Sequence, residues 1–166
     1  MAADTELATL LGVLNSKRTH VLGILEGLDE EALRRPVLPS GWTCLGLVHH
    51  LALDDEKFWF RAVAAGERSA IEEILTSGEN AWLPGPQKSA EEILALYRRE
   101  GERADSFLTG ADLDAAPAWW PDFFSGWQYD TLREVVLHVI TETATHAGHL
   151  DAVRELIDGR QRLVIT

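Results

Sequence analysis

The fold class is determined by residues 131–159, which read TLREVVLHVITETATHAGHLDAVRELIDG. Apolar residues recur in this stretch at spacings of three and four, which is the period of one face of an α-helix. Gly159 follows the last periodic residue, and glycine is typical of the position just after a helix. The stretch therefore predicts one long amphipathic helix from about Thr131 to Asp158.

Three further segments show the same helical period, and no segment has the alternating β-branched pattern or the Asn-Gly turn of a β-hairpin. Short helical turns are expected over DEEAL (residues 29–33) and within 67–88. We predict an all-α four-helix bundle with short extra helical turns in its loops, as a single domain over residues 1–166. The three segments are Thr5–Leu28, Thr43–Gly66, and residues 89–110, which open with a Ser89/Glu92 capping box.

Composition excludes several classes of protein. The 166 residues carry 27 acidic and 15 basic side chains, a net charge of −12, which disfavours nucleic-acid binding because that binding neutralises phosphates. No apolar run approaches the ~20 residues of a membrane span, and the first residues lack a secretory signal pattern, so we expect a cytoplasmic protein. Cys44, the single cysteine, excludes a disulfide framework and is expected to pack in the core.

A cluster of histidine and glutamate lies at the edge of the apolar face of residues 131–159. Glu142 and His146 are four residues apart, so their side chains converge one turn from each other. Together with His138 they fall within about 80° around the helix. Burying such groups is costly unless they are paired or bind a cation. The pattern leaves both a metal site and an ordinary hydrogen-bonded cluster open.

A third ligand must come from another helix. The segment GLVHHLALDDE offers His49 and His50, and periodicity does not choose between them because this helix is apolar on most of its circumference. On an α-helix His50 shares a stripe with Asp54, Lys57 and Arg61, a pattern that also fits a solvated strip.

Two motifs together resemble a known family. LPSGWTCLGLVHHLALDDEKFWF (residues 38–60) and the stretch 131–159 are similar to the DinB-like superfamily of metal-binding four-helix bundles. The likeness is closer to the branch that includes the N-terminal domain of mycothiol-dependent maleylpyruvate isomerase, and it covers nearly the whole chain. That isomerase has a second, C-terminal domain that these residues do not contain, so we expect a stand-alone relative with another electrophile.

The resemblance implies a ligand set. A histidine in a His-Leu-Ala segment completes the site in this superfamily, which corresponds here to His50. Glu142 replaces the first histidine of the usual His-x-x-x-His pair and His146 is the second. Two imidazoles and one carboxylate suit a divalent metal ion, zinc above all, with nickel or iron(II) as alternatives. His138 and Asp54 are the expected partners that orient these ligands.

The resemblance also implies a function. It is activation of a low-molecular-weight thiol of the mycothiol or bacillithiol type, for S-transfer or isomerisation of an electrophilic substrate in detoxification. Arg133 and Arg154 are candidates to bind a carboxylate of the thiol, and they also fit ordinary solvent-facing helix charges. His149 is the candidate catalytic residue, as the base that a metal-dependent hydrolase would need beside its bound water. The resemblance also implies a homodimer, since dimers are common in the superfamily. The alternatives are a metal-dependent hydrolase and a non-catalytic, metal-stabilised binding or stress-response module.

An aromatic segment precedes the last helix and has no clear period. It is expected to form a wall of the substrate pocket, to pack on the end of the bundle, or to form a dimer contact. His20, in the first helix, is expected to be a surface or capping residue. The aromatic residues of the segment are Trp119, Trp120, Phe123, Phe124 and Trp127.

Overall fold

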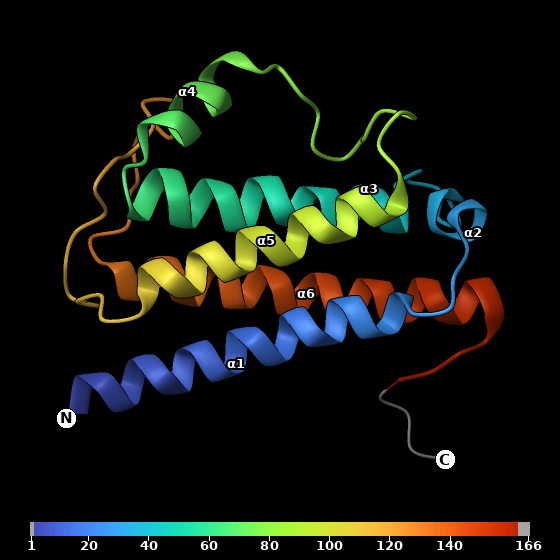
Figure 1. The fold of residues 1–166 in the computed structure, drawn as a ribbon, viewed down its shortest axis with the longest axis horizontal. Coiled ribbons are helices and arrows are strands. Elements are labelled where there is room, and N and C mark those ends of the chain that lie inside the picture. The colour runs from blue at the N-terminus through green and yellow to red at the C-terminus, as the bar shows by residue number, and fades with distance from the viewer. Residues whose placement is uncertain (1, 163–166) are drawn as a thin grey trace.

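The computed structural model describes residues 2–162, with side chains described for residues 5–162. All regular elements in this range are helical (Figure 1). None of these helices is both long and apolar enough to cross a lipid bilayer. In chain order the elements are α1 (Ala2–Leu25), α2 (Glu30–Arg34), α3 (Cys44–His50), η1 (Leu51–Ala64), α4 (Arg68–Thr76), α5 (Ala90–Leu108) and α6 (Leu132–Asp158).

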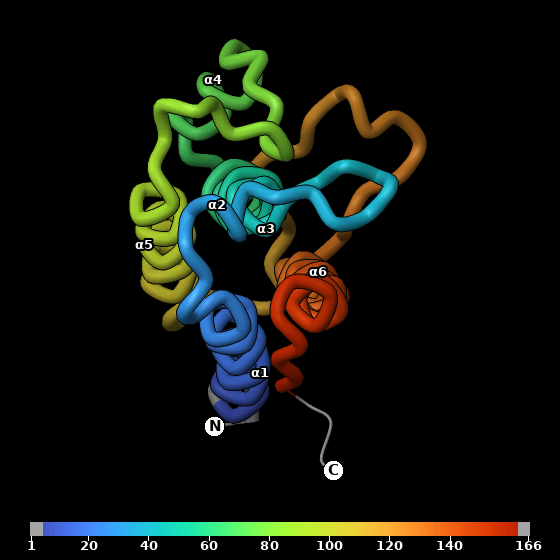
Figure 2. Tube along the Cα trace, turned by 90° about the vertical axis from the view of Figure 1, so that its right-hand side faces the viewer, coloured from blue at the N-terminus to red at the C-terminus, as the bar shows by residue number. Residues whose placement is uncertain are grey.

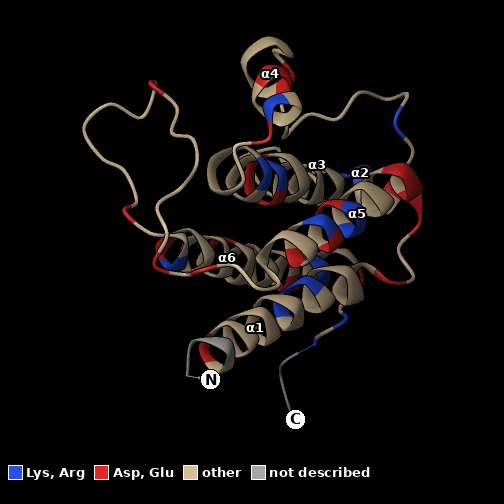
Figure 3. Ribbon diagram, turned by 60° about the vertical axis from the view of Figure 1, so that its left-hand side comes forward, with Lys and Arg blue, Asp and Glu red and all other residues tan. Residues whose placement is uncertain are grey.

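The predicted four-helix bundle is confirmed. Helices α3 and η1 form one continuous helix, which packs against α5 and α6, and α1 packs along α6 (Figure 2). The short helices α2 and α4 lie in the two regions where extra helical turns were predicted. The long connection from α5 to α6 is the aromatic segment, and it carries acidic but no basic residues (Figure 3).

The helix ends follow the residues that predicted them. The Ser89 hydroxyl accepts from the backbone N–H of Glu92, whose carboxylate accepts from the Ser89 N–H, which completes the capping box of α5. Thr131 forms the same arrangement at the start of α6. At the other end of α6, Gly159 has φ 78°, the left-handed conformation that glycine adopts without strain.

The second long helix changes its hydrogen-bond pattern after His50. From Leu51 onward it is a π-helix, and at its end the N–H of Ala65 donates to the carbonyl of Phe60, five residues earlier, at 3.0 Å. A π-helix has more residues per turn than an α-helix. The predicted stripe of His50 with Lys57 and Arg61 is therefore wrong, because it was drawn with the α-helical period.

A layer of polar side chains divides the interior. Asp55 and Glu56 on η1, and Glu142 and Thr143 on α6, lie between residues of two apolar clusters. Glu56 is fully buried and pairs with Arg18 of α1 at 2.5 Å. Glu142 of the predicted site lies at the same level of the bundle as this layer, but its side chain is 37 % exposed. The first cluster includes Val21, Leu47 and Leu150, and the second includes Leu14, Phe60 and Val135.

Candidate metal centre

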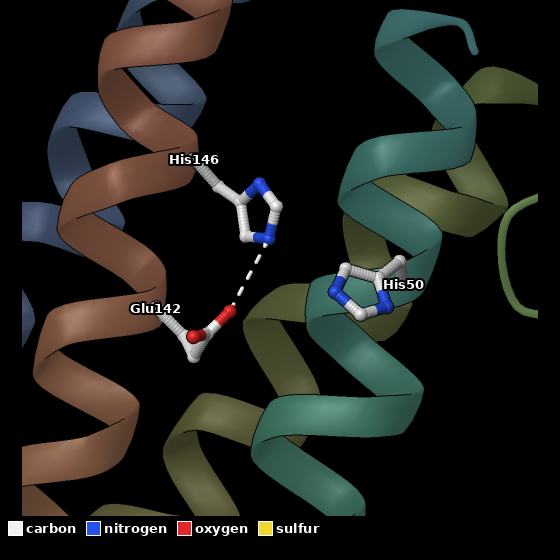
Figure 4. Close-up of side chains that lie close together, drawn as sticks. All are labelled: His50, Glu142 and His146. Atoms are coloured by element: carbon white, nitrogen blue, oxygen red, sulfur yellow. Dashed lines mark ion pairs between the residues drawn. The ribbon is translucent and has the colours of Figure 1, made fainter. Parts of the chain in front are cut away.

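His50, Glu142 and His146 converge between α3 and α6 (Figure 4). His50 is the last residue of α3, and the other two lie one turn apart on α6. One potential ligand atom from each of the three lies within 4.8 Å of the others. Nε2 of His146 is 3.5 Å from a carboxylate oxygen of Glu142. The structure therefore brings together the three residues that the sequence and its family resemblance singled out.

Asp54 holds the ring of His50. Its Oδ2 lies 2.8 Å from Nδ1 of His50, one turn away along the helix. A carboxylate that accepts from one ring nitrogen fixes the tautomer and leaves the other nitrogen free to bind a metal. The contact expected for Asp54 is thus present, and it involves Nδ1 of His50 and not Nε2.

A loop covers the ring of His50 on one side. The indole of Trp82 stacks on it, with ring centroids 4.2 Å apart and an angle of 20° between planes. His49 is fully buried, and its Nδ1 lies 2.7 Å from the carbonyl of Ala81, which ties this loop to α3. Gly46 permits the close approach, since a Cβ there would lie 2.4 Å from the carbonyl oxygen of Trp82. Trp82 was not predicted as a site residue, because in the sequence it is only a tryptophan in a Pro- and Gly-rich loop.

The environment keeps His146 neutral. Its side chain is only 12 % exposed. Burial, reinforced by the neighbouring His50, lowers the pKa of His146 to about 4. A neutral imidazole is the form that binds metal ions. Burial likewise lowers the pKa of His138, whose Nδ1 lies 3.0 Å from the hydroxyl of Tyr129. The hydrogen bond that His138 makes among the described residues thus goes to Tyr129, and not to one of the three converging side chains.

His149 stands beside the cluster. It is exposed, and its Nδ1 lies 3.3 Å from Nδ1 of His146, the ring nitrogen that does not face Glu142. This contact supports a role in orienting His146. Its catalytic role stays a prediction.

The two arginines that were candidates to bind a carboxylate of the thiol are engaged elsewhere. Arg133 is hydrogen-bonded to Glu6 and Asp114. Arg154 is buried and donates to Asp158 and to the carbonyl of Ile24. The expectation that they bind the thiol is wrong, because each guanidinium is already hydrogen-bonded to another segment of the bundle.

Two other expectations from the sequence are now decided. Cys44 is buried in the core as expected, and burial raises the pKa of its thiol to about 11. The expectation of a surface or capping role for His20 is wrong. His20 is only 9 % exposed, and its Nε2 lies 2.8 Å from a carboxylate oxygen of Asp151. Asp151 lies on α6, so this contact joins α1 to the site-bearing helix.

A cavity of about 400 Å³ opens beside the cluster, and His50 and Glu142 form part of its wall. Asp55 also lines it, is 3 % exposed, and has an Oδ2 without a hydrogen-bond partner among the described residues. Burial, together with the charge of Glu142, raises the pKa of Asp55 well above its usual value. The aromatic part of the wall consists of Phe58, Trp59, Phe123 and Phe124.

The donor set fits a divalent metal ion. Two imidazole nitrogens and one carboxylate oxygen converge, the ring of His50 is oriented by Asp54, and His146 is neutral. Three protein ligands leave positions open for water or a substrate, which is the pattern of catalytic rather than structural sites. His50, Glu142 and His146 are therefore the residues that could hold the metal.

Comparison with known proteins identifies the family of the chain. The family model for mycothiol-S-transferase matches residues 9–159. The matched span contains His50, Glu142 and His146, and it runs from within α1 to the end of α6. No curated protein matches the chain. The chain belongs to the mycothiol-S-transferase family.

Proposed function

We propose that this protein is a divalent-metal-dependent S-transferase that joins mycothiol to an electrophilic substrate. The observation that carries the proposal is the convergence of His50, Glu142 and His146, with Asp54 behind His50, in a member of this family. The cavity beside the cluster supports it, since a transfer reaction needs room for a second substrate.

Zinc is the metal we propose, and nickel or iron(II) would suit the same donor set. A divalent ion held by His50, Glu142 and His146 would lower the pKa of a thiol bound to it and so favour the thiolate at neutral pH. The role of the protein is then to keep its donors in the correct protonation state and orientation. His146 meets the first condition through burial, and His50 meets the second through Asp54.

The surrounding side chains position the candidate ligands and exclude water from them. Trp82 covers one side of the His50 ring, so water reaches that ring from fewer directions. His149 supports the ring of His146 from its Nδ1 side, which makes it a positioning residue in this proposal instead of the base that the sequence predicted. Sulfur forms a bond to the electrophilic carbon, the leaving group departs with its electron pair, and the thiol proton passes to solvent.

The first experiment is metal analysis of the purified protein beside the variants His50→Ala and Glu142→Ala. We expect stoichiometric metal in the wild type and its loss from both variants. The matched control is His20→Ala, because His20 also pairs with a carboxylate but belongs to a different contact. After cobalt substitution, addition of mycothiol should produce a thiolate-to-cobalt charge-transfer band.

Each other outcome contradicts the proposal in a different way. Metal without any response to mycothiol, together with ester or amide hydrolysis, would identify a hydrolase. Unfolding of the bundle on metal removal would identify a structural ion, since the apolar helix faces should otherwise hold the fold. Absence of bound metal from the wild type would leave the cluster as hydrogen-bonded polar residues.

A further inference from the structure

The cavity beside His50 and Glu142 has two chemically different ends. One end consists of His50 and Glu142, two of the three candidate metal ligands, together with Asp54, Asp55 and His138. The other end is aromatic. The whole cavity has a volume of about 400 Å³, which lies within the range of sites that bind small molecules. A ligand in this cavity would thus have its reactive part beside the cluster and its body among aromatic rings.

The aromatic end is built by two segments that are distant in sequence. Phe58 and Trp59 lie on η1, and Phe123 and Phe124 lie in the connection before α6. The rings of Trp59 and Phe124 are stacked at 5.8 Å with 13° between their planes, and Phe58 meets Phe123 at 6.2 Å. Phe123 is 58 % exposed, so it lies at the mouth of the cavity. Such flat faces favour a flat, apolar ligand.

Among the described residues, no Lys or Arg lines the cavity. The connection that carries Phe123 has no Lys or Arg either (Figure 3). The nearest basic residues along η1 are engaged elsewhere, Lys57 with Glu73 and Arg61 with Glu67 and Glu100. The two charges of a divalent ion would be offset by Glu142 and by the thiolate itself. A carboxylate on the ligand would therefore be buried without a partner, which is costly.

We infer that this cavity is the electrophile subsite and that it takes a flat, neutral, largely apolar electrophile. The inference rests on the proposed function. Asp55 adds one polar contact, because its unpartnered Oδ2 lines the cavity and is available to hydrogen-bond with the ligand. Small organic anions are excluded as good substrates by the absence of Lys and Arg.

Binding is tested first in the metal-free protein, so that neither metal nor thiol contributes to the result. Naphthol is the neutral probe and naphthoate is the matched anion, and calorimetry at neutral pH gives both dissociation constants. We expect saturable binding of naphthol, and binding of naphthoate that is weaker by about tenfold or more because of its unpaired carboxylate. Equal affinities, or no saturable binding of naphthol, would overturn the inference.

Variants at the mouth of the cavity locate the binding site. Phe123→Ala should weaken naphthol about fivefold through the loss of one aromatic contact. Phe107→Ala is the control, because Phe107 is a half-buried aromatic residue that lines a different pocket. Compared with Phe123→Ala, Phe123→Lys should bind naphthoate more tightly. It should still bind naphthol more weakly than the wild type does. The same effect from Phe107→Ala, or no gain for naphthoate in Phe123→Lys, would contradict the assignment.

Turnover separates this inference from the proposed function. With chlorodinitrobenzene as electrophile, the C–S bond forms, the C–Cl bond breaks, chloride leaves with the bonding pair and the thiol proton passes to solvent. Phe123→Ala should raise KM for this flat substrate by a larger factor than KM for iodoacetamide, which has no aromatic ring, and Phe107→Ala should change neither. If Phe123→Ala keeps the metal and the cobalt–thiol band but shows no selective rise in KM for chlorodinitrobenzene, the subsite is refuted and the proposed function is not. If the cobalt-substituted wild type shows no such band with mycothiol, the proposed function is refuted instead.

Discussion

Removal of Asp54 should weaken metal binding without removing a ligand. Its Oδ2 lies 2.8 Å from Nδ1 of His50, and such outer partners contribute about tenfold to a hundredfold to metal affinity. The carboxylate of Asp54 is 52 % exposed, so solvent screens it. We therefore expect the lower end for Asp54→Ala, about tenfold or ~1.4 kcal/mol. Asp54→Asn keeps an acceptor oxygen but loses the charge, and should lie between this variant and the wild type.

The measurement is a competition titration of zinc between the protein and a chromophoric chelator at neutral pH. Asp151→Ala is the matched control, because Asp151 also contacts a histidine, His20, at 2.8 Å. Its zinc affinity should equal that of the wild type. Unchanged affinity in Asp54→Ala, or an equal loss in the control, would refute the idea that Asp54 acts by orienting His50.

Four further predictions concern stability and reactivity. Gly46→Ala should destabilise the fold by about 1–3 kcal/mol in thermal unfolding, because its Cβ would lie 2.4 Å from a loop carbonyl. Gly12→Ala, whose Cβ would meet nothing within 4 Å, should stabilise α1. Arg18→Ala should cost about 3–5 kcal/mol in denaturant unfolding, since it leaves Glu56 buried without its partner. Burial raises the pKa of Cys44 to about 11, so below that pH the thiolate is the minor form. Aromatic disulfide reagents should then label the folded protein slowly at about pH 8, and the unfolded protein quickly.

The regular parts of the bundle could be predicted from the sequence. The caps at Ser89 and Thr131 depend on contacts between residues three apart, so they are visible in the chain itself. The convergence of Glu142 and His146 needed only that α6 be a regular α-helix, which it is. Choosing His50 over His49 depended on the family resemblance, and the structure brings His50 to the cluster while His49 bonds to a loop.

The parts that could not be predicted depend on tertiary contacts. The stripe drawn through His50 and Lys57 assumed an α-helical period, but the helix is a π-helix from Leu51 onward. Trp82 reaches His50 only because a glycine and a buried histidine hold its loop, and neither effect has a local sequence pattern. The aromatic segment showed its composition but not its shape, so Phe123 could not be placed at a cavity mouth from the sequence.

The position of the polar layer is better explained by function than by stability. Replacing buried ion pairs with apolar residues is often neutral or stabilising, yet Glu56 is buried with Arg18, and Asp55 is buried with an oxygen that lacks a partner among the described residues. The π-helix starts directly after His50 and places both Asp54 and Asp55 on the cavity wall. One of these carboxylates holds the His50 ring and the other is left for a ligand. Core stability is thus given up at the level where, in the proposed reaction, thiol and electrophile meet.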